Sequence, residues 1–159
     1  MNLLMSIFTV AVLAAAPVSE LRAAIPIGIH SFGLHPALVV TVAIIGNMIP
    51  AVLIIYFLEP FIRWLGKYIP FIHKFFDKWL VRAREKVRPQ IDKYGIPGLV
   101  IFIGIPLPMT GVWTGAAGAV LLGFSKKNAL LASFGGVVMA AVIVLVLDLG
   151  LASVFKFFR

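Results

Sequence analysis

Residues 94–125 form a run of 32 residues without a formal charge, and this run is too long for a single membrane crossing. As a straight helix it would extend about 48 Å, whereas the hydrocarbon core of a bilayer is about 30 Å thick. Several prolines and glycines interrupt the run, and two lysines follow it directly. We therefore expect a re-entrant hairpin that enters the membrane, breaks near residues 106–111 and leaves on the side that it entered.

The composition of the whole chain is that of an integral membrane protein. Hydrophobic residues make up 62% of the chain and charged residues only 13%, against roughly half and a quarter in a soluble domain. Two apolar stretches, 34–58 and 128–150, are each long enough for one full crossing. Residues 1–33 allow a second broken hairpin. We expect a single membrane domain that covers residues 1–159.

The first 16 residues could be read as the apolar part of a signal peptide. However, no Lys or Arg precedes Arg22, whereas a signal peptide begins with positive charge. Pro17 would also lie directly after the expected cleavage site. We therefore expect this segment to remain in the mature fold as part of the first hairpin.

The linker between the two halves, residues 61–93, is strongly basic and contains nine of the 14 Lys and Arg residues. From Phe71 to Arg88 its apolar residues recur at three- and four-residue spacing, which is typical of an amphipathic helix lying in the membrane interface. Pro89 is expected to end this helix. The positive-inside rule places the linker in the cytoplasm, with anionic lipid headgroups rather than nucleic acid as its partners. A more specific lipid-binding or regulatory role stays open.

The two halves of the chain have a similar layout. A shift of 90 residues superposes three glycines of the first half on three of the second, and each half reads as a broken hairpin followed by one full span. With the linker inside, the first hairpin enters from outside and the second from inside, which is an inverted repeat. The expected fold is thus an all-α membrane protein with two re-entrant hairpins, two transmembrane helices and an interfacial helix between them. Both termini are expected outside.

Two charged side chains lie within the apolar first hairpin. Glu20 and Arg22 fall between Pro17 and Pro26, where dehydration makes a charge costly unless it is paired or in use. The prolines predict a break in the helix here. We expect Glu20 to accept a proton or a cation and Arg22 to bind an anionic group. The alternative is that both residues lie at the membrane surface and anchor the hairpin.

Further candidates for substrate or ion binding lie where the apolar segments break. Asn47 comes shortly before a proline in the first span, and a helix-packing hydrogen bond is an equally good explanation of it. Trp113 suits the protein core or the interface as well as a substrate. Asp148 is expected to be solvated at the end of the last span. The full set of candidates is Glu20, Arg22, Pro26, Asn47, Pro106, Pro108, Thr110, Trp113 and Thr114.

Three motifs resemble those of a known family: PVSELRAAIPIG from Pro17, IIGNMIP from Ile44 and IPLPMTGVWTGA from Ile105. In order and spacing they are similar to the small multidrug export protein family, and the resemblance covers nearly the whole chain. That family is regarded as a distant relative of the DedA/VTT membrane proteins. The resemblance implies paired re-entrant hairpins that face each other, with the acidic and basic residues of the first hairpin in the functional site.

We therefore expect a secondary transporter or exporter of the plasma (inner) membrane, coupled to protons. Its substrate would be small and amphiphilic or anionic, and would pass through a site between the two hairpins. Relatives in the DedA/VTT group are linked to moving phospholipids or polyprenyl phosphates, so a lipid flippase or scramblase is one alternative. A non-transporting membrane assembly factor is a second alternative.

An enzyme is not expected, because the chain has no nucleophile elbow and no phosphate-binding loop. The three histidines have no acidic or thiol companions at ligand spacing, so neither a metal site nor a cofactor is expected. Two spans and two hairpins make a thin bundle, which favours a homo-oligomer. The face expected for this contact consists of the small residues Gly115, Ala116, Gly118 and Ala119.

Overall fold

The regular elements of the described chain are helices. The computed structural model describes residues 2–68, 70–107 and 110–157, and these residues contain no strand. The all-α class is therefore confirmed. In chain order the helices are α1 (Leu3–Ala15), α2 (Glu20–Pro26), the π-helix η1 (Ile27–Ser31), α3 (Pro36–Tyr68), α4 (Pro70–Tyr94), α5 (Ile96–Gly104), α6 (Val112–Leu121) and α7 (Lys126–Phe157).

Two helices have the length and composition of membrane spans. Within the described residues these are α3 and the part of α7 from Lys126 to Gly150. Both expose large apolar side chains, such as Phe57, which is 60% exposed, and Val146, which is 63% exposed. Contiguous exposed apolar surface of this kind suits lipid far better than water. The chain is a membrane protein, as its composition predicts.

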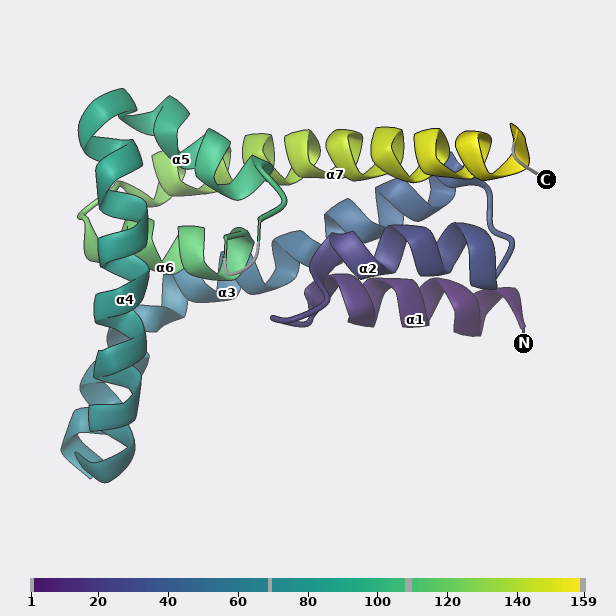
Figure 1. The fold of residues 1–159 in the computed structure, drawn as a ribbon. Helices are drawn as coiled ribbons and strands as arrows, with labels where there is room; N and C mark the ends of the chain where they lie inside the picture. The colour runs from purple at the N-terminus through teal and green to yellow at the C-terminus, as the bar shows by residue number, and fades with distance from the viewer. Residues whose placement is uncertain (1, 69, 108–109, 158–159) are drawn as a thin grey trace.

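Two helical hairpins meet near the middle of the molecule (Figure 1). α1 runs beside α2 and η1, α5 lies near α6, and the turn of each hairpin points toward the other. The amphipathic helix α4 lies across one end, and the start of α1 and the end of α7 lie at the opposite end. This arrangement fits the expected topology. The depth of the hairpins in a membrane and the inverted repeat stay predictions.

Prolines within the helices do not end them, and this corrects two predicted boundaries. α4 continues through Pro89 to Tyr94, and α3 continues ten residues past the predicted end of the first span. A proline removes one helical hydrogen bond and leaves one carbonyl free. Pro89 lies on an exposed surface, where solvent can serve that carbonyl. In the first hairpin, α2 likewise passes through Pro26 into η1, so the turn is confined to residues 16–19.

The small residues of α6 are buried inside the chain, so the predicted dimer face is wrong. Ala116 and Ala119 have no exposed surface. A Cβ added at Gly118 would lie 2.6 Å from a methyl group of Val87 in α4, and one at Gly115 would collide with a side chain of α5. These residues let α6 pack closely against its own chain. A homo-oligomer stays a prediction and needs another face.

Gly98 sets the closest approach of α5 to α4, and it provides a test of this packing. A Cβ at this position would overlap the backbone carbonyl of Gln90, which cannot move aside as a flexible side chain can. We predict that Gly98→Ala lowers the free energy of unfolding by about 1–3 kcal/mol. Thermal unfolding in detergent measures this. Gly150→Ala is the matched control, because a Cβ there meets nothing within 4 Å. Equal unfolding midpoints for the two variants would contradict the packing.

Candidate functional site

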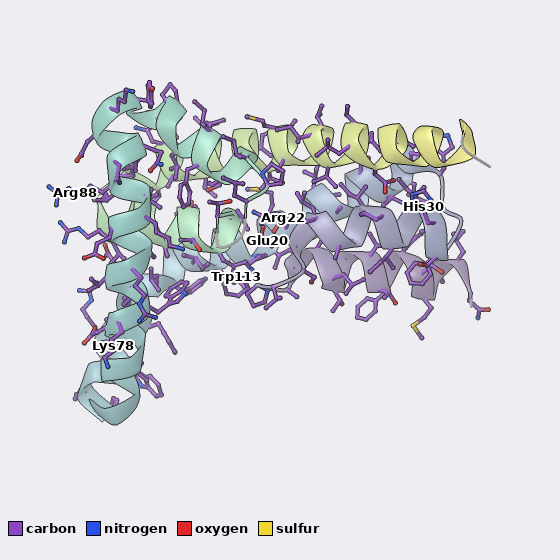
Figure 2. The ribbon with its side chains drawn as sticks, in the orientation of Figure 1. Glu20, Arg22, His30, Lys78, Arg88 and Trp113 are labelled. Atoms are coloured by element: carbon purple, nitrogen blue, oxygen red, sulfur yellow. The ribbon has the colours of Figure 1, made fainter. Side chains whose placement is uncertain are left out.

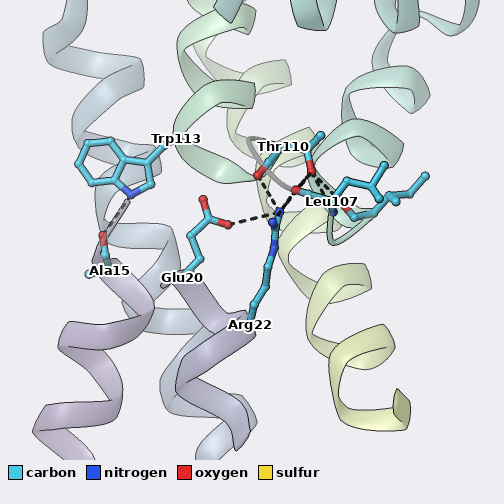
Figure 3. Close-up of polar contacts among 7 residues, drawn as sticks. Ala15, Glu20, Arg22, Leu107, Thr110 and Trp113 are labelled. Carbon is cyan, nitrogen blue, oxygen red and sulfur yellow. Dashed lines mark hydrogen bonds and ion pairs between the residues drawn. The ribbon is translucent and has the colours of Figure 1, made fainter. Parts of the chain in front are cut away.

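The side chain of Arg22 joins the turns of the two hairpins (Figure 3). Its guanidinium group donates hydrogen bonds to the backbone carbonyl oxygens of Leu107 and Thr110, the second at 2.6 Å, and to the Thr110 hydroxyl at 3.2 Å. Hydrogen bonds from a charged donor are stronger than neutral ones. They connect α2 to a loop more than 80 residues later in the chain. The structure thus brings together Arg22 and Thr110, which are both among the candidate site residues.

Thr110 also organises the loop that Arg22 binds. Its hydroxyl oxygen lies 2.7 Å from the carbonyl oxygen of Leu107 and 2.9 Å from that of Ile105, and the amide of Leu107 donates to it at 3.2 Å. The loop leaves the helix at α5 and re-enters it at α6, so its carbonyls lack helical partners. The backbone amides of Leu107 and Thr110 donate to two of these carbonyls, and the Arg22 guanidinium and the Thr110 hydroxyl, which donates to one of them at a time, supply further partners.

Glu20 lies beside Arg22 at the start of α6. Its carboxylate is 3.9 Å from Arg22 Nη2, and its side chain is only 8% exposed. A Cβ at Gly111, the residue that precedes α6, would collide with this carboxylate. The backbone amides of Val112 and Trp113 donate hydrogen bonds to it. The N-terminus of a helix carries partial positive charge, so α6 and Arg22 both favour a negative charge at this position.

The backbone at Glu20 has an unusual conformation. Its φ angle is 46°, the only positive value outside glycine among the described residues. This left-handed conformation is disfavoured for side chains that carry a Cβ, and it persists only where the surroundings fix it. Conformations of this kind are found preferentially at functional sites. Glu20 lies where the turn of residues 16–19 passes into α2.

The first hairpin is also tied to the second through Trp113. The indole Nε1–H donates a hydrogen bond to the carbonyl oxygen of Ala15 at 3.1 Å. Ser19 donates to the carbonyl oxygen of Leu13 at 2.6 Å. Both acceptors belong to the last turn of α1, whose carbonyls have no helical partner. Trp113 therefore serves this site through its indole N–H and, at Glu20, through its backbone.

An apolar groove of about 510 Å³ lies next to this polar contact. Trp113 and Pro17 form its inner end, and the remaining residues come from α3 and α4. All nine lining residues are apolar: Pro17, Pro50, Leu53, Ile54, Phe57, Leu58, Phe61, Trp79 and Trp113. A volume of this size is typical of a site for a drug-sized molecule.

The remaining candidates lie outside the contact between the turns. Asn47 is 2% exposed in α3, and its Oδ1 atom has no hydrogen-bond partner among the described residues. Pro26 lies at the junction of α2 and η1, and Thr114 is half-buried beside Trp113. Pro106 is half-buried in the loop before α6, whereas Pro108 lies outside the described residues.

One polar pair was not foreseen from the sequence. His30 Nε2 lies 2.9 and 3.0 Å from the two carboxylate oxygens of Asp148, and this contact joins η1 to α7 at the end of the molecule opposite α4 (Figure 2). The side chain of Asp148 is 12% exposed, so the prediction that it is solvated is wrong. The two residues are 118 positions apart, and only the packing of the first hairpin against α7 brings them together.

The fold and this site define a helical membrane protein in which two hairpins meet at a buried Glu–Arg contact. The model of the family described as "Putative small multi-drug export protein" matches residues 20–143. The chain belongs to this family, as the three sequence motifs indicate. The family name points to a membrane exporter rather than to an enzyme. No curated protein and no solved structure matches the chain.

The role of Arg22 as a tie between the hairpins can be tested by its removal. We predict that Arg22→Ala lowers the free energy of unfolding by about 1.5–3 kcal/mol, because two loop carbonyls lose a charged donor. Hydrogen exchange at residues 105–112 should accelerate in the same variant. Arg88→Ala is the control, since that side chain is exposed on α4 and pairs only with Asp92 among the described residues. Unchanged exchange at residues 105–112 in Arg22→Ala would show that the tie is not needed.

Proposed function

We propose that the chain is a proton-coupled exporter of the plasma (inner) membrane, and that Glu20 is the group that exchanges the proton. The observation that carries this proposal is the burial of the Glu20 carboxyl between Arg22 and the N-terminus of α6. A buried carboxyl in an apolar environment is costly to keep charged, so such a group is retained where it is used. Its neighbours at this position favour the charged form, and the burial opposes it.

The two protonation states of Glu20 would differ in what holds Arg22. With Glu20 charged, Arg22 has a carboxylate and two loop carbonyls as partners, and the turns of the hairpins are held together. With Glu20 protonated, the carboxylate no longer attracts the guanidinium, and an anionic group of a substrate can compete for it. Loss of the proton would restore the internal contact and release the substrate. Proton movement and substrate movement would thereby be coupled.

The substrate class follows from the two parts of the site. Arg22 offers a planar group that binds carboxylates and phosphates in a bidentate manner. The apolar groove that begins at Trp113 lies close to it, so a substrate with both an anionic and an apolar part fits the site. This same combination supports the second candidate function, a flippase for lipid phosphates. Both candidates place the substrate between the hairpins, and they differ in whether transport needs a proton gradient.

Transport by variants in reconstituted vesicles tests the proposal. Glu20→Gln should still bind an anionic substrate but lose transport driven by a pH difference, because the amide cannot exchange a proton. Arg22→Ala should lower uptake of a fluorescent lipid phosphate by about ten- to a hundredfold, the loss expected for a charged hydrogen bond. Arg22→Lys should retain part of the activity, since it keeps the positive charge but loses the planar guanidinium group that binds in a bidentate manner. Glu59→Gln is the matched control, because Glu59 is exposed on α3.

A lipophilic cation in the same assay separates this proposal from export of cationic drugs. A cation exporter would lose binding in Glu20→Gln and keep it in Arg22→Ala, the opposite order. A flippase would keep lipid transport in Glu20→Gln without any pH difference. If both variants carried both substrates at wild-type rates, the pair would be only an anchor and the site assignment would be wrong.

A further inference from the structure

The apolar groove between α3 and α4 extends from the site toward the basic end of the molecule. Along α3 it runs from Pro50 to Phe61, which is about 16 Å at the rise of an α-helix. This length is close to half the hydrocarbon core of about 30 Å, the depth of one leaflet. Pro17 and Trp113 line the groove beside the site, and Trp79 lines it from α4. The groove therefore has the depth that one acyl chain needs.

The groove is open at the molecular surface. Phe57 is 60% exposed and Leu53 is 52% exposed, although both line it. They lie on a helix that is long and apolar enough to span a bilayer, so the open side faces the hydrocarbon of the membrane. A chain could enter the groove sideways from the surrounding leaflet without crossing a polar barrier.

Positive charge lies beside the α4 end of the groove. Lys78 is the direct neighbour of Trp79 and Arg82 lies one turn further, and both side chains are exposed (Figure 2 labels Lys78). Lys86 continues the same row one turn later. Residues 77–88 contain two acidic side chains, Asp77 and Glu85. They contain five basic ones, namely the three cations just named and two further arginines. Cations at the level of the membrane surface attract anionic lipid.

We propose that this groove is a binding site for one anionic phospholipid of the leaflet next to α4. One acyl chain lies in the groove between Phe57 of α3 and Trp79 of α4 and ends near Trp113. The phosphate group lies on Lys78 and Arg82. The phosphate would lie at α4, away from the Glu20–Arg22 contact, while the acyl chain would occupy the groove that the apolar part of the proposed substrate also uses. Lipid binding can be measured without transport. Because the inner end of the groove includes Trp113, whose indole binds the last turn of α1, the acyl chain would also support the contact between the hairpins.

Lipid retention by the purified full-length chain tests the proposal. The protein in detergent is given equal amounts of phosphatidylglycerol and phosphatidylcholine with identical acyl chains, and bound lipid is counted by native mass spectrometry. We expect one phosphatidylglycerol per chain, retained about tenfold over phosphatidylcholine. The double variant Lys78→Glu with Arg82→Glu should lose this preference. The double variant Arg88→Glu with Lys93→Glu makes the same change of charge further along α4. It should keep the preference for phosphatidylglycerol.

A second pair of variants tests the groove itself. Leu53→Trp places a large ring in the groove and should reduce retention of both lipids at least about fivefold, since the acyl chain is excluded. Ile45→Trp is the control, because Ile45 is exposed on α3 and does not line the groove. Unfolding midpoints near the wild-type value confirm that the variants are folded.

Three results would overturn the proposal. The first is equal retention of the two lipids by the wild-type chain. The second is retention in Leu53→Trp that matches Ile45→Trp. The third is a change of oligomeric mass in Leu53→Trp with lipid retention intact, which would make the groove an interface between copies of the chain. None of these results depends on whether the chain transports a substrate.

Discussion

The contact between the two hairpins depends on how the charge of Arg22 is satisfied. A guanidinium group in an apolar bundle requires acceptors, and here the acceptors are carbonyl oxygens of the loop between α5 and α6, where the helical hydrogen-bond pattern is broken. The loop needs donors and Arg22 needs acceptors, so each satisfies the other. The Glu20 carboxylate lies beside Arg22 Nη2, the nitrogen that also donates to Thr110, and accepts hydrogen bonds from the backbone amides at the start of α6. Arg22 therefore shares its charge between the Glu20 carboxylate of its own hairpin and the loop of the other hairpin.

Much of this arrangement could be predicted from the sequence, because its cause is local. A charged pair between two prolines in an apolar run indicates a broken helix, and so does an uncharged run too long for one span. Both predicted breaks are present, and Glu20, Arg22, Thr110 and Trp113 all lie where they meet. The family resemblance pointed to the same residues.

Other features depend on contacts between distant segments, and the sequence carried no signal for them. His30 and Asp148 form a pair only because α2, which precedes η1, packs beside α7. The small residues of α6 were read as a surface for a second copy, yet α4 and α5 of the same chain cover them. Whether a glycine faces a neighbouring helix of its own chain or of another is decided by the three-dimensional packing. Pro26 and Pro89 were read as helix breakers, but each removes only one hydrogen bond, and the helices continue.

The central claim is that Glu20 exchanges a proton while it lies buried beside Arg22. Infrared difference spectroscopy on the chain in lipid vesicles measures this directly, since a protonated carboxyl group has a carbonyl band that a carboxylate lacks. We predict that a shift to lower pH produces such a band and that the band is absent in Glu20→Gln but present in the exposed control Glu59→Gln. A band that persists unchanged in Glu20→Gln, or no protonated carboxyl in the wild-type chain at any pH at which it transports, would contradict the account.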